Sequence, residues 1–254
     1  MGAAPMEINM TDMIQQNSPL VFLGSSSNLE LWVELAERAG VTIIGIIDSD
    51  YFGNTDNIAG IPIIGSQDQV NVLLDLATEK NAKFFIATNW DPVESYGERD
   101  NQKRLDFIKL AEDLNLPLGN LIDPLAVVPK SVVLYGGVYI GAFVVLEPHV
   151  QIGKHTQVWY HSSIGHHTQI GDDCVLQRYT KIWGTKMGNH SYLSMGATYA
   201  GNYKTSEIGK NVFIHPGLVI AGRPIADNEV VTIRESLKNR RRTFADGNIT
   251  AEEE

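Results

Sequence analysis

Branched aliphatic residues recur every six positions through the second half of the chain, and a small or β-branched residue follows four positions after each. One large and one small inward residue per six describe a short strand that ends in a tight corner. A coiled-coil helix would repeat every seven residues and a hairpin strand every two. We therefore predict a solenoid of triangular coils, with three strands and about 18 residues to a coil. The aliphatic series is Val128, Leu134, Ile140, Leu146, Ile152, Val158, Ile164, Ile170, Leu176 and Ile182.

The repeat breaks in two places, and each break predicts a change at a corner. Lys186 stands where a small residue is due, and the pattern resumes one residue early at Met187. The pattern breaks again from Ala200 to Glu207, which predicts a loop that leaves the solenoid. Such loops commonly line sites on rigid scaffolds. After the repeat we expect a capping helix over residues 230–244 and a disordered tail.

The first half alternates apolar runs with segments of helical period. This order predicts an α/β domain with a parallel sheet. The expected strands are residues 20–24, 42–48 and 83–88, and the expected helices are residues 28–39, 67–80 and 99–114. The expected organisation is an N-terminal extension (1–17), an α/β domain (18–120), the solenoid (121–229), and a capping helix with a disordered tail (230–254).

Composition narrows the class of protein. The chain has 254 residues, 43% of them hydrophobic, and a net charge of −10, which argues against a general binder of nucleic acid or of an anionic membrane. Its single cysteine, Cys174, allows no intrachain disulfide and falls in a small inward slot of the repeat. No apolar run approaches the roughly 20 residues of a membrane span. We expect a cytoplasmic protein.

Polar residues follow each predicted strand of the first half, at the sheet edge where ligands bind in α/β domains. The dinucleotide fingerprint G-x-G-x-x-G is absent, so a bound dinucleotide is not expected. Hydroxyls and helix N-terminal amides could hold a phosphate or a sugar, or the serines could simply cap the helix. The residues concerned are Ser26, Ser27, Asn28, Asp48, Ser49 and Asn89.

Histidines are concentrated in the repeat. Those at 149, 155, 161 and 167 share one phase, which places them at successive corners that face solvent or a neighbouring subunit. The adjacent pair His166 and His167 is the best candidate for a general base. Gly184 follows His166 by one coil, and its amide could stabilise an oxyanion. The alternative is a row of solvated histidines, and no spacing supports a metal site.

Several segments resemble one family. The chain is similar to hexapeptide-repeat sugar acyltransferases, namely the bacillosamine- and perosamine-type N-acetyltransferases and their sialic-acid O-acetyltransferase relatives. The resemblance implies a Rossmann-like sugar-nucleotide-binding domain, a left-handed parallel β-helix, a homotrimer and acetyl-CoA as co-substrate, without a tightly bound cofactor. The matching segments are residues 22–26, 47–49, 84–87, 121–126, 162–167, 193–197 and 200–202.

The resemblance also implies roles for single residues. His166 matches the catalytic base, and His167 stands where the family has an acidic partner. Ser26, Ser27 and Asn28 match the sugar-nucleotide loop, which is usually rich in glycine. Asp48 and Ser49 match the acidic pair on the nucleobase side, and Asn89 falls at the end of the third strand. Relative to the family there is one extra coil between His166 and Met187, and the closing Gly-x-Pro-Ala is missing. Coil geometry makes Gly184 the oxyanion donor, whereas local matching favours Gly201. The residues assigned to acetyl-CoA are Gly184, Tyr192, Gly201 and Pro216.

These observations leave three hypotheses. The first is N-acetylation of a nucleotide-linked amino sugar of the 4-amino-4,6-dideoxy type, for polysaccharide biosynthesis. The second is O-acetylation of a sugar, or use of a different acyl donor. The third is a non-catalytic trimeric sugar-nucleotide-binding protein.

Overall fold

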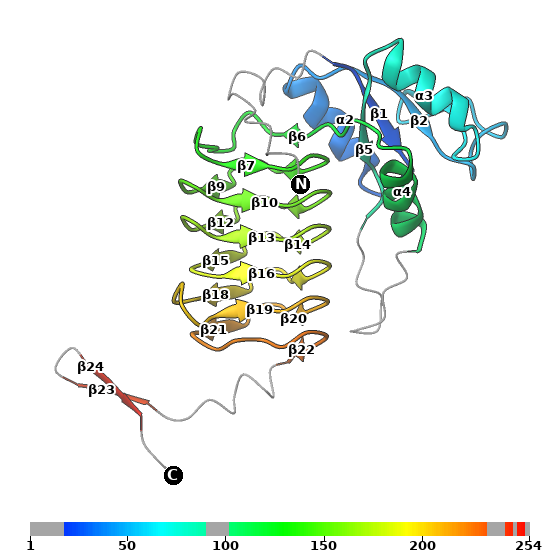
Figure 1. The fold of residues 1–254 in the computed structure, drawn as a ribbon. Helices are drawn as coiled ribbons and strands as arrows, with labels where there is room; N and C mark the ends of the chain where they lie inside the picture. The colour runs from blue at the N-terminus through cyan, green and yellow to red at the C-terminus, as the bar shows by residue number, and fades with distance from the viewer. Residues whose placement is uncertain (1–17, 90–101, 233–241, 246–247, 252–254) are drawn as a thin grey trace, which may run out of the picture.

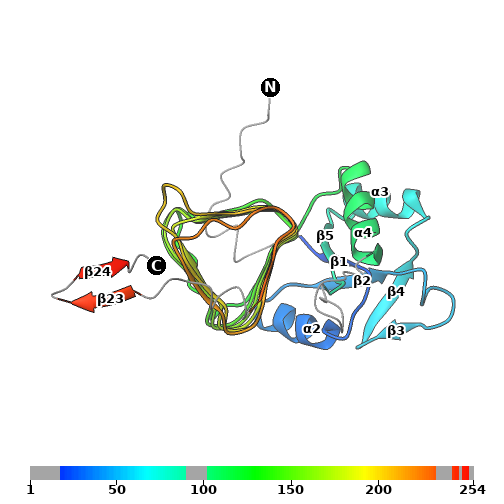
Figure 2. The ribbon, with the colours of Figure 1, turned by 90° about the horizontal axis from the view of Figure 1, so that it is seen from below.

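The chain forms an α/β domain followed by a parallel β-helix. The structure, a computed structural model, describes residues 18–89, 102–232, 242–245 and 248–251. Figure 1 shows the strands of the second half stacked as a ladder, with the α/β domain beside its first coils. Seen along the ladder in Figure 2, the coils superimpose as a triangle, and the α/β domain lies at one vertex.

The sheet of the α/β domain has the order β3-β4-β2-β1-β5. Its strands are β1 (Leu20–Leu23), β2 (Ile43–Ile47), β3 (Asn57–Ile58), β4 (Ile61–Gly65) and β5 (Lys83–Ile86). All pairs are parallel except β3 with β4, so the sheet is mixed and the expected all-parallel sheet is corrected at this edge. Strands β3 and β4 were not predicted from the sequence, and Pro62 lies in β4, between β3 and β2.

Three helices cover the sheet as predicted. They are α2 (Leu29–Arg38), α3 (Val70–Thr78) and α4 (Gln102–Asp113). Trp32 and Leu35 of α2 are fully buried, and Phe107 of α4 packs into the core on the other side of the sheet. These apolar faces hold the helices against the strands.

The β-helix consists of three parallel sheets, named here I, II and III. Sheet I contains β7 (Val133–Leu134), β10 (Gln151–Ile152), β13 (Gln169–Ile170), β16 (Lys186–Met187) and β19 (Glu207–Ile208). Sheet II contains β6 (Leu121–Ile122), β8 (Tyr139–Ile140), β11 (Gln157–Val158), β14 (Val175–Leu176), β17 (Tyr192–Leu193), β20 (Phe213–Ile214) and β22 (Val230–Val231). Sheet III contains β9 (Val145–Leu146), β12 (Ser163–Ile164), β15 (Lys181–Trp183), β18 (Thr198–Ala200) and β21 (Val219–Ala221).

The predicted six-residue repeat is confirmed by the pairing. Ile152 pairs with Ile170, 18 residues on, and both point into one apolar core that also contains Cys174. Ile170 pairs with Met187 after 17 residues, which confirms the early resumption of the pattern. Met187 pairs with Ile208 because residues 201–206 form the expected loop between β18 and β19. We name the corners I–II, II–III and III–I after the sheets they join.

Beyond the repeat the described residues contain strands where a helix was expected. Val230–Val231 form β22, which adds to sheet II, and Arg242–Ala245 form β23. Strand β23 pairs antiparallel with β24 (Asn248–Ala251), which lies in the segment expected to be disordered. Residues 233–241, the middle of the expected helix, lie outside the described part of the chain.

The α/β domain packs on sheet II and on the I–II corner. Trp32 of α2 contacts Tyr139 edge-on at 6.3 Å, and Tyr139 contacts Trp159 at 5.0 Å. Arg38 donates to the fully buried carboxylate of Asp123 at 2.6 Å. These contacts fix the α/β domain on one side of the prism.

Candidate active site

His166 lies at the III–I corner, two residues after the end of β12, where its exposed ring faces away from the apolar interior. Its Nδ1 is 3.1 Å from Nδ1 of His167, so one ring donates this hydrogen bond and the other accepts it. With Nδ1 engaged, Nε2 is the nitrogen of His166 that remains for a substrate proton. The neighbouring imidazole of His167 therefore orients His166, the candidate base.

Two further residues hold His166 in place. Glu147, one coil earlier, accepts the backbone N–H of His166 with Oε2 at 2.7 Å. The Tyr203 ring stacks on the His166 ring, with centroids 5.1 Å apart and planes 12° apart. The Tyr203 hydroxyl is 3.4 and 3.3 Å from the two ring nitrogens, which is the geometry of a face contact. Neither residue was predicted from the sequence, because Glu147 comes next to His166 only through the stacking of coils.

Tyr203 reaches His166 because its loop is ordered by Asn202. The Asn202 side-chain oxygen accepts the backbone N–H groups of Lys204, Thr205 and Ser206. The backbone N–H of Tyr203 donates to the Gly184 carbonyl at 2.7 Å. The predicted loop thus lies back across one coil and places an aromatic ring beside the candidate base.

His166, Glu147 and Tyr203 line a pocket of about 400 Å³. Gly165 forms part of it because a Cβ there would lie 2.4 Å from Cβ of Trp183, so only glycine leaves room for the indole. Trp183 and Tyr203 are 39% and 49% exposed. The pocket lining is Glu147, Ser163, Gly165, His166, Lys181, Ile182, Trp183 and Tyr203.

Gly184 and Gly201 occupy the next two coils of the same corner. A Cβ at Gly184, where φ is +65°, would lie 2.9 Å from the Gly201 backbone and 3.1 Å from the Tyr203 ring. The Gly201 N–H donates to the Trp183 carbonyl at 2.8 Å. The Gly184 N–H faces the Tyr203 phenol, and this backbone hydrogen bond acts to lower the pKa of the phenol. The two amides therefore differ in their partners, which are a carbonyl of the coil for Gly201 and a side chain of the loop for Gly184.

The histidines at 149, 155, 161 and 167 occupy a repeated backbone conformation. Each has a φ between +58° and +65°. Histidine, asparagine and aspartate are enriched among non-glycine residues in this left-handed region, so part of the histidine row has a local structural cause. The expectation that this row faces solvent or a subunit is wrong for His155, which is buried beneath the α/β domain.

On the α/β domain the predicted strand-end residues come together. Asn89 accepts hydrogen bonds from Ser26 Oγ at 3.3 Å and from Asn28 Nδ2 at 2.7 Å, and it donates to Ser27 Oγ at 3.1 Å. The Asn28 side chain makes no capping hydrogen bond to α2. The cluster therefore joins two strand ends, which a simple helix cap would not do.

Asp48 is fully buried at the end of β2 and is held by several donors. Ser25 Oγ donates to it at 2.8 Å, and Lys103 Nζ lies 2.9 Å away. Burial lowers the pKa of Lys103, but hydrogen bonds to Asp50 and Asp48 outweigh this and raise it. Ser49 lies nearby and exchanges two hydrogen bonds with Gln67. Lys103 was not predicted, because only the fold brings α4 to this strand end.

A cavity of about 520 Å³ adjoins this end of the sheet. Phe107 and Leu110 give it an apolar wall, and Lys103 with Asp50 gives it a charged one. Its dimensions and mixed lining suit a small organic ligand.

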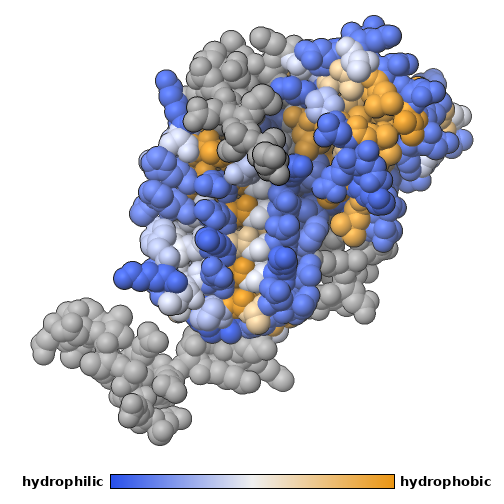
Figure 3. All heavy atoms as spheres, viewed as in Figure 1, coloured by the Kyte–Doolittle hydropathy of each residue, from blue (hydrophilic) through white to orange (hydrophobic). Residues whose placement is uncertain are grey.

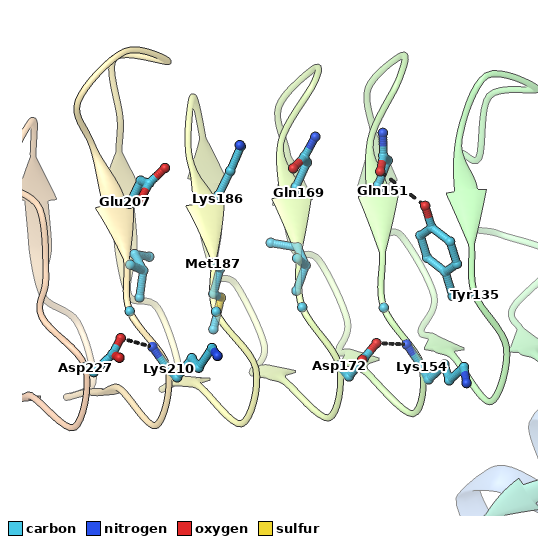
Figure 4. Close-up of a pocket in the computed structure, with 16 residues that line it drawn as sticks. Tyr135, Gln151, Lys154, Gln169, Asp172, Lys186, Met187, Glu207, Lys210 and Asp227 are labelled. Atoms are coloured by element: carbon cyan, nitrogen blue, oxygen red, sulfur yellow. Dashed lines mark hydrogen bonds between the residues drawn. The ribbon is translucent and has the colours of Figure 1, made fainter. Parts of the chain in front are cut away.

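A larger groove of about 590 Å³ runs along sheet I, away from His166. Its floor contains Gly153, Gly171, Gly188 and Gly209, and Figure 4 shows polar side chains along both sides. In Figure 3 hydrophilic columns flank a paler strip on this face. A Cβ at Gly153 would lie 2.4 Å from Asp172, whose carboxylate accepts the Lys154 N–H. Coil stacking therefore explains these glycines without a ligand.

One chain does not bring all the predicted site residues together. The α/β domain lies at one vertex of the triangle (Figure 2), and its contacts place it at the I–II corner. His166, Gly184 and Gly201 lie at the III–I corner. Tyr192 is on the outer face of sheet II, where it stacks on Phe213. Pro216 is at the II–III corner.

Within the described ranges, no cluster of three or more His, Cys, Asp or Glu side chains could hold a metal ion. No helix in those ranges is both long and apolar enough to cross a bilayer.

Comparisons with known proteins establish the fold. No family model matches the chain, and no curated protein matches it. A mutant of perosamine N-acetyltransferase from Caulobacter crescentus, in complex with CoA and GDP-perosamine, has 24% identity and a TM-score of 0.67, over 84% of this chain and 92% of that chain.

Two other solved structures show the same likeness. The acetyltransferase domain of PglB from Neisseria gonorrhoeae, in complex with acetyl coenzyme A, has 20% identity and a TM-score of 0.67, over 84% of this chain and 94% of that chain. WeeI from Acinetobacter baumannii has 18% identity and a TM-score of 0.66, over 85% and 97%. The shared architecture is an α/β domain joined to a parallel β-helix.

Proposed function

We propose that this chain is an acyltransferase that moves the acetyl group of acetyl-CoA to the amino group of a nucleotide-linked 4-amino-4,6-dideoxy sugar. The observation that carries the proposal is the exposed His166–His167 pair at a 400 Å³ pocket, on the same corner as Gly184 and Gly201. The likeness in fold to proteins solved with CoA, acetyl-CoA or GDP-perosamine supports it.

His166 is the general base of the proposed reaction. The sugar nitrogen attacks the thioester carbonyl carbon, and Nε2 of His166 takes a proton from that nitrogen. A C–N bond forms and the C–S bond breaks. The proton then passes to the sulfur, which leaves as the thiol of CoA. Nδ1–H of the charged His166 donates to His167, which replaces the acidic partner expected from the resemblance.

Gly184 is the proposed oxyanion donor. Its N–H faces the exposed Tyr203 phenol, which an acyl group would displace, whereas that of Gly201 donates to the Trp183 carbonyl within the coil. A backbone donor released in this way can stabilise the negative oxygen of the tetrahedral intermediate. Acetyl-CoA would pass along Gly184 and Gly201, and Tyr192 and Pro216 would contact it only from another copy of the chain.

The nucleotide-linked sugar binds at the strand ends of a Rossmann-like domain. Ser26, Ser27, Asn28 and Asn89 supply donors and acceptors for a diphosphate and sugar, and Asp48 and Ser49 lie on the nucleobase side. Because the α/β domain that carries these residues and His166 lie at different corners of one prism, the acceptor held by one chain meets His166 of a neighbouring chain. We therefore propose a cytoplasmic homotrimer of left-handed β-helices, which light scattering would test.

A coenzyme A release assay tests the function. It combines acetyl-CoA with UDP-, dTDP- and GDP-linked 4-amino sugars and compares wild type, His166→Ala and, as a control at another corner, His161→Ala. Wild type should turn over, and His166→Ala should lose about 100-fold in kcat/KM. Equal activity of wild type and His166→Ala would exclude His166 as the base.

A non-catalytic sugar-nucleotide-binding protein is the second candidate. The Tyr203 ring lies beside Gly184, where an acyl group would have to bind. This obstruction favours the non-catalytic protein. In that case a nucleotide sugar binds without any release of coenzyme A.

A further inference from the structure

The His166 pocket contains one carboxylate, that of Glu147. Glu147 follows β9, and Leu146 pairs with Ile164 of the next coil. This register places Glu147 beside Gly165, one residue from His166. The carboxylate is thus part of the wall that a group bound to His166 must face.

One oxygen of this carboxylate is committed and the other is available. Oε2 accepts the His166 N–H at 2.7 Å. Among the described residues no hydrogen-bond partner is found for Oε1, and no Lys, Arg or His nitrogen forms an ion pair with Glu147. A half-buried carboxylate with a free oxygen is suited to bind a cation that enters the pocket.

Aromatic rings complete the surroundings of this oxygen. Tyr203 and Glu147 line the same pocket. Partial burial and the Glu147 carboxylate raise the pKa of the Tyr203 phenol and outweigh a hydrogen bond from the Gly184 backbone that lowers it. Trp183 adds a second partly exposed ring. A carboxylate beside aromatic faces is the combination that binds a protonated amine, because both groups attract positive charge.

The one other charged side chain of the lining is Lys181. On β15, Lys181 precedes Trp183 by two residues, so it starts about 7 Å further from the III–I corner along the strand. Lys181 therefore leaves the negative charge at the His166 end of the pocket uncompensated.

We propose that Glu147 determines the acceptor class: it binds the ammonium group of an amino sugar beside His166 and so selects amines over hydroxyls. The bound ammonium group loses one proton to water before the neutral amine attacks, and His166 takes the second proton during the attack. This inference rests on the proposed function and specifies its acceptor. A neutral hydroxyl gains far less than an ammonium group from a carboxylate.

Glu147→Gln tests the inference because glutamine retains an oxygen for the His166 N–H and loses only the charge. Glu207→Gln makes the same change on sheet I and serves as the matched control. Calorimetry would measure binding of UDP-, dTDP- and GDP-linked 4-amino-4,6-dideoxy sugars and of their 4-hydroxy counterparts, without acetyl-CoA, at pH 6.5. The affinity of Glu147→Gln for the amino sugar should fall by about 10- to 100-fold. Its affinity for the hydroxy sugar, and both affinities of Glu207→Gln, should stay within about threefold of wild type.

Two results would overturn the inference: equal binding of amino and hydroxy sugars by wild type, or unchanged amino-sugar binding by Glu147→Gln. The coenzyme A assay separates this from failure of the proposed reaction. Turnover with an unaffected Glu147→Gln refutes the role of Glu147 alone. Loss of amine selectivity in Glu147→Gln without any turnover by wild type refutes the reaction and leaves the role of Glu147 supported.

Discussion

Arg104 of α4 and Asp173 of the I–II corner form an ion pair of 2.7 Å in which both side chains are almost fully buried. Arg104 also donates to the carbonyl oxygens of Thr88, at 2.8 Å, and His155, at 2.6 Å. Asp173 in turn lies 3.2 Å from Nδ1 of His190. One guanidinium therefore connects the end of β5 with two coils of the β-helix.

Replacing Arg104 with methionine should destabilise the protein by about 3–5 kcal/mol, because it leaves the buried Asp173 carboxylate without its main partner. Urea unfolding measures this. Arg223→Met is the control, since the Arg223–Glu229 pair is partly exposed and should contribute less than about 1 kcal/mol. Equal midpoints for the two variants would contradict the role assigned to Arg104.

His155 should make stability depend on pH. Burial, followed by the positive charge of Arg104, lowers its pKa to about 4. The unfolded chain, with a pKa of about 6.5 at this residue, therefore takes up the proton first as the pH falls. The contribution of neutral, buried His155 to the free energy of unfolding is fully present above about pH 6.5. It is lost progressively as the pH falls to about 4, by about 3 kcal/mol in all.

His155→Asn removes this titration and keeps a residue that tolerates positive φ, so the free energy of unfolding should vary less between pH 6.5 and 4. Phe143→Asn changes a corner residue with nearly the same φ and should keep the wild-type slope. An unchanged slope in His155→Asn would assign the pH dependence to other groups.

Replacing His167 with glutamate should increase kcat at pH 7 by about tenfold, because a carboxylate stabilises the charged His166 ring better than a neutral imidazole does. Steady-state coenzyme A release measures this. His149→Glu adds the same charge one coil away, where the ring contacts His167 rather than His166. A comparable gain in His149→Glu would show a general charge effect.

Gly184→Ala should cost more stability than Gly217→Ala. Both glycines have nearly the same φ, +65° and +67°, so each variant pays about 1 kcal/mol for the left-handed conformation. Only the Cβ at Gly184 meets other atoms, the Gly201 backbone and the Tyr203 ring, which adds about 1–3 kcal/mol. Thermal unfolding of the two variants measures the difference.

The repeat made most of the β-helix predictable. An inward residue such as Ile164 has a fixed period, and the slip before Met187 and the loop before Ile208 both appear as breaks in that period. Strands β3 and β4 have no such pattern and were missed. The helix expected over residues 230–244 was inferred from the local sequence alone, and at Val230–Val231 pairing with β20 prevails.

The site was less predictable because its contacts are distant in sequence. His166 and Asn89 could be proposed from their position after predicted strands. Glu147 and Tyr203 reach His166 only through coil stacking and an ordered loop, and Arg104 gains its partners only when the domains pack. The burial of His155 likewise depends on where the α/β domain docks.

The stacking of coils also limits how this molecule can vary. Each coil adds one strand spacing, about 4.8 Å, to the height of the prism. The α/β domain is anchored at the level of Asp173 and His155, and Tyr203 and His166 mark the level of the candidate site. Insertion or deletion of a whole coil between those levels would shift the candidate site relative to the α/β domain by that fixed increment. The orientation of the side chains around the prism axis would not change. The distance along the prism axis between the α/β domain and the site therefore changes only in steps of one coil. Homologues with different numbers of coils should differ in this distance by whole steps.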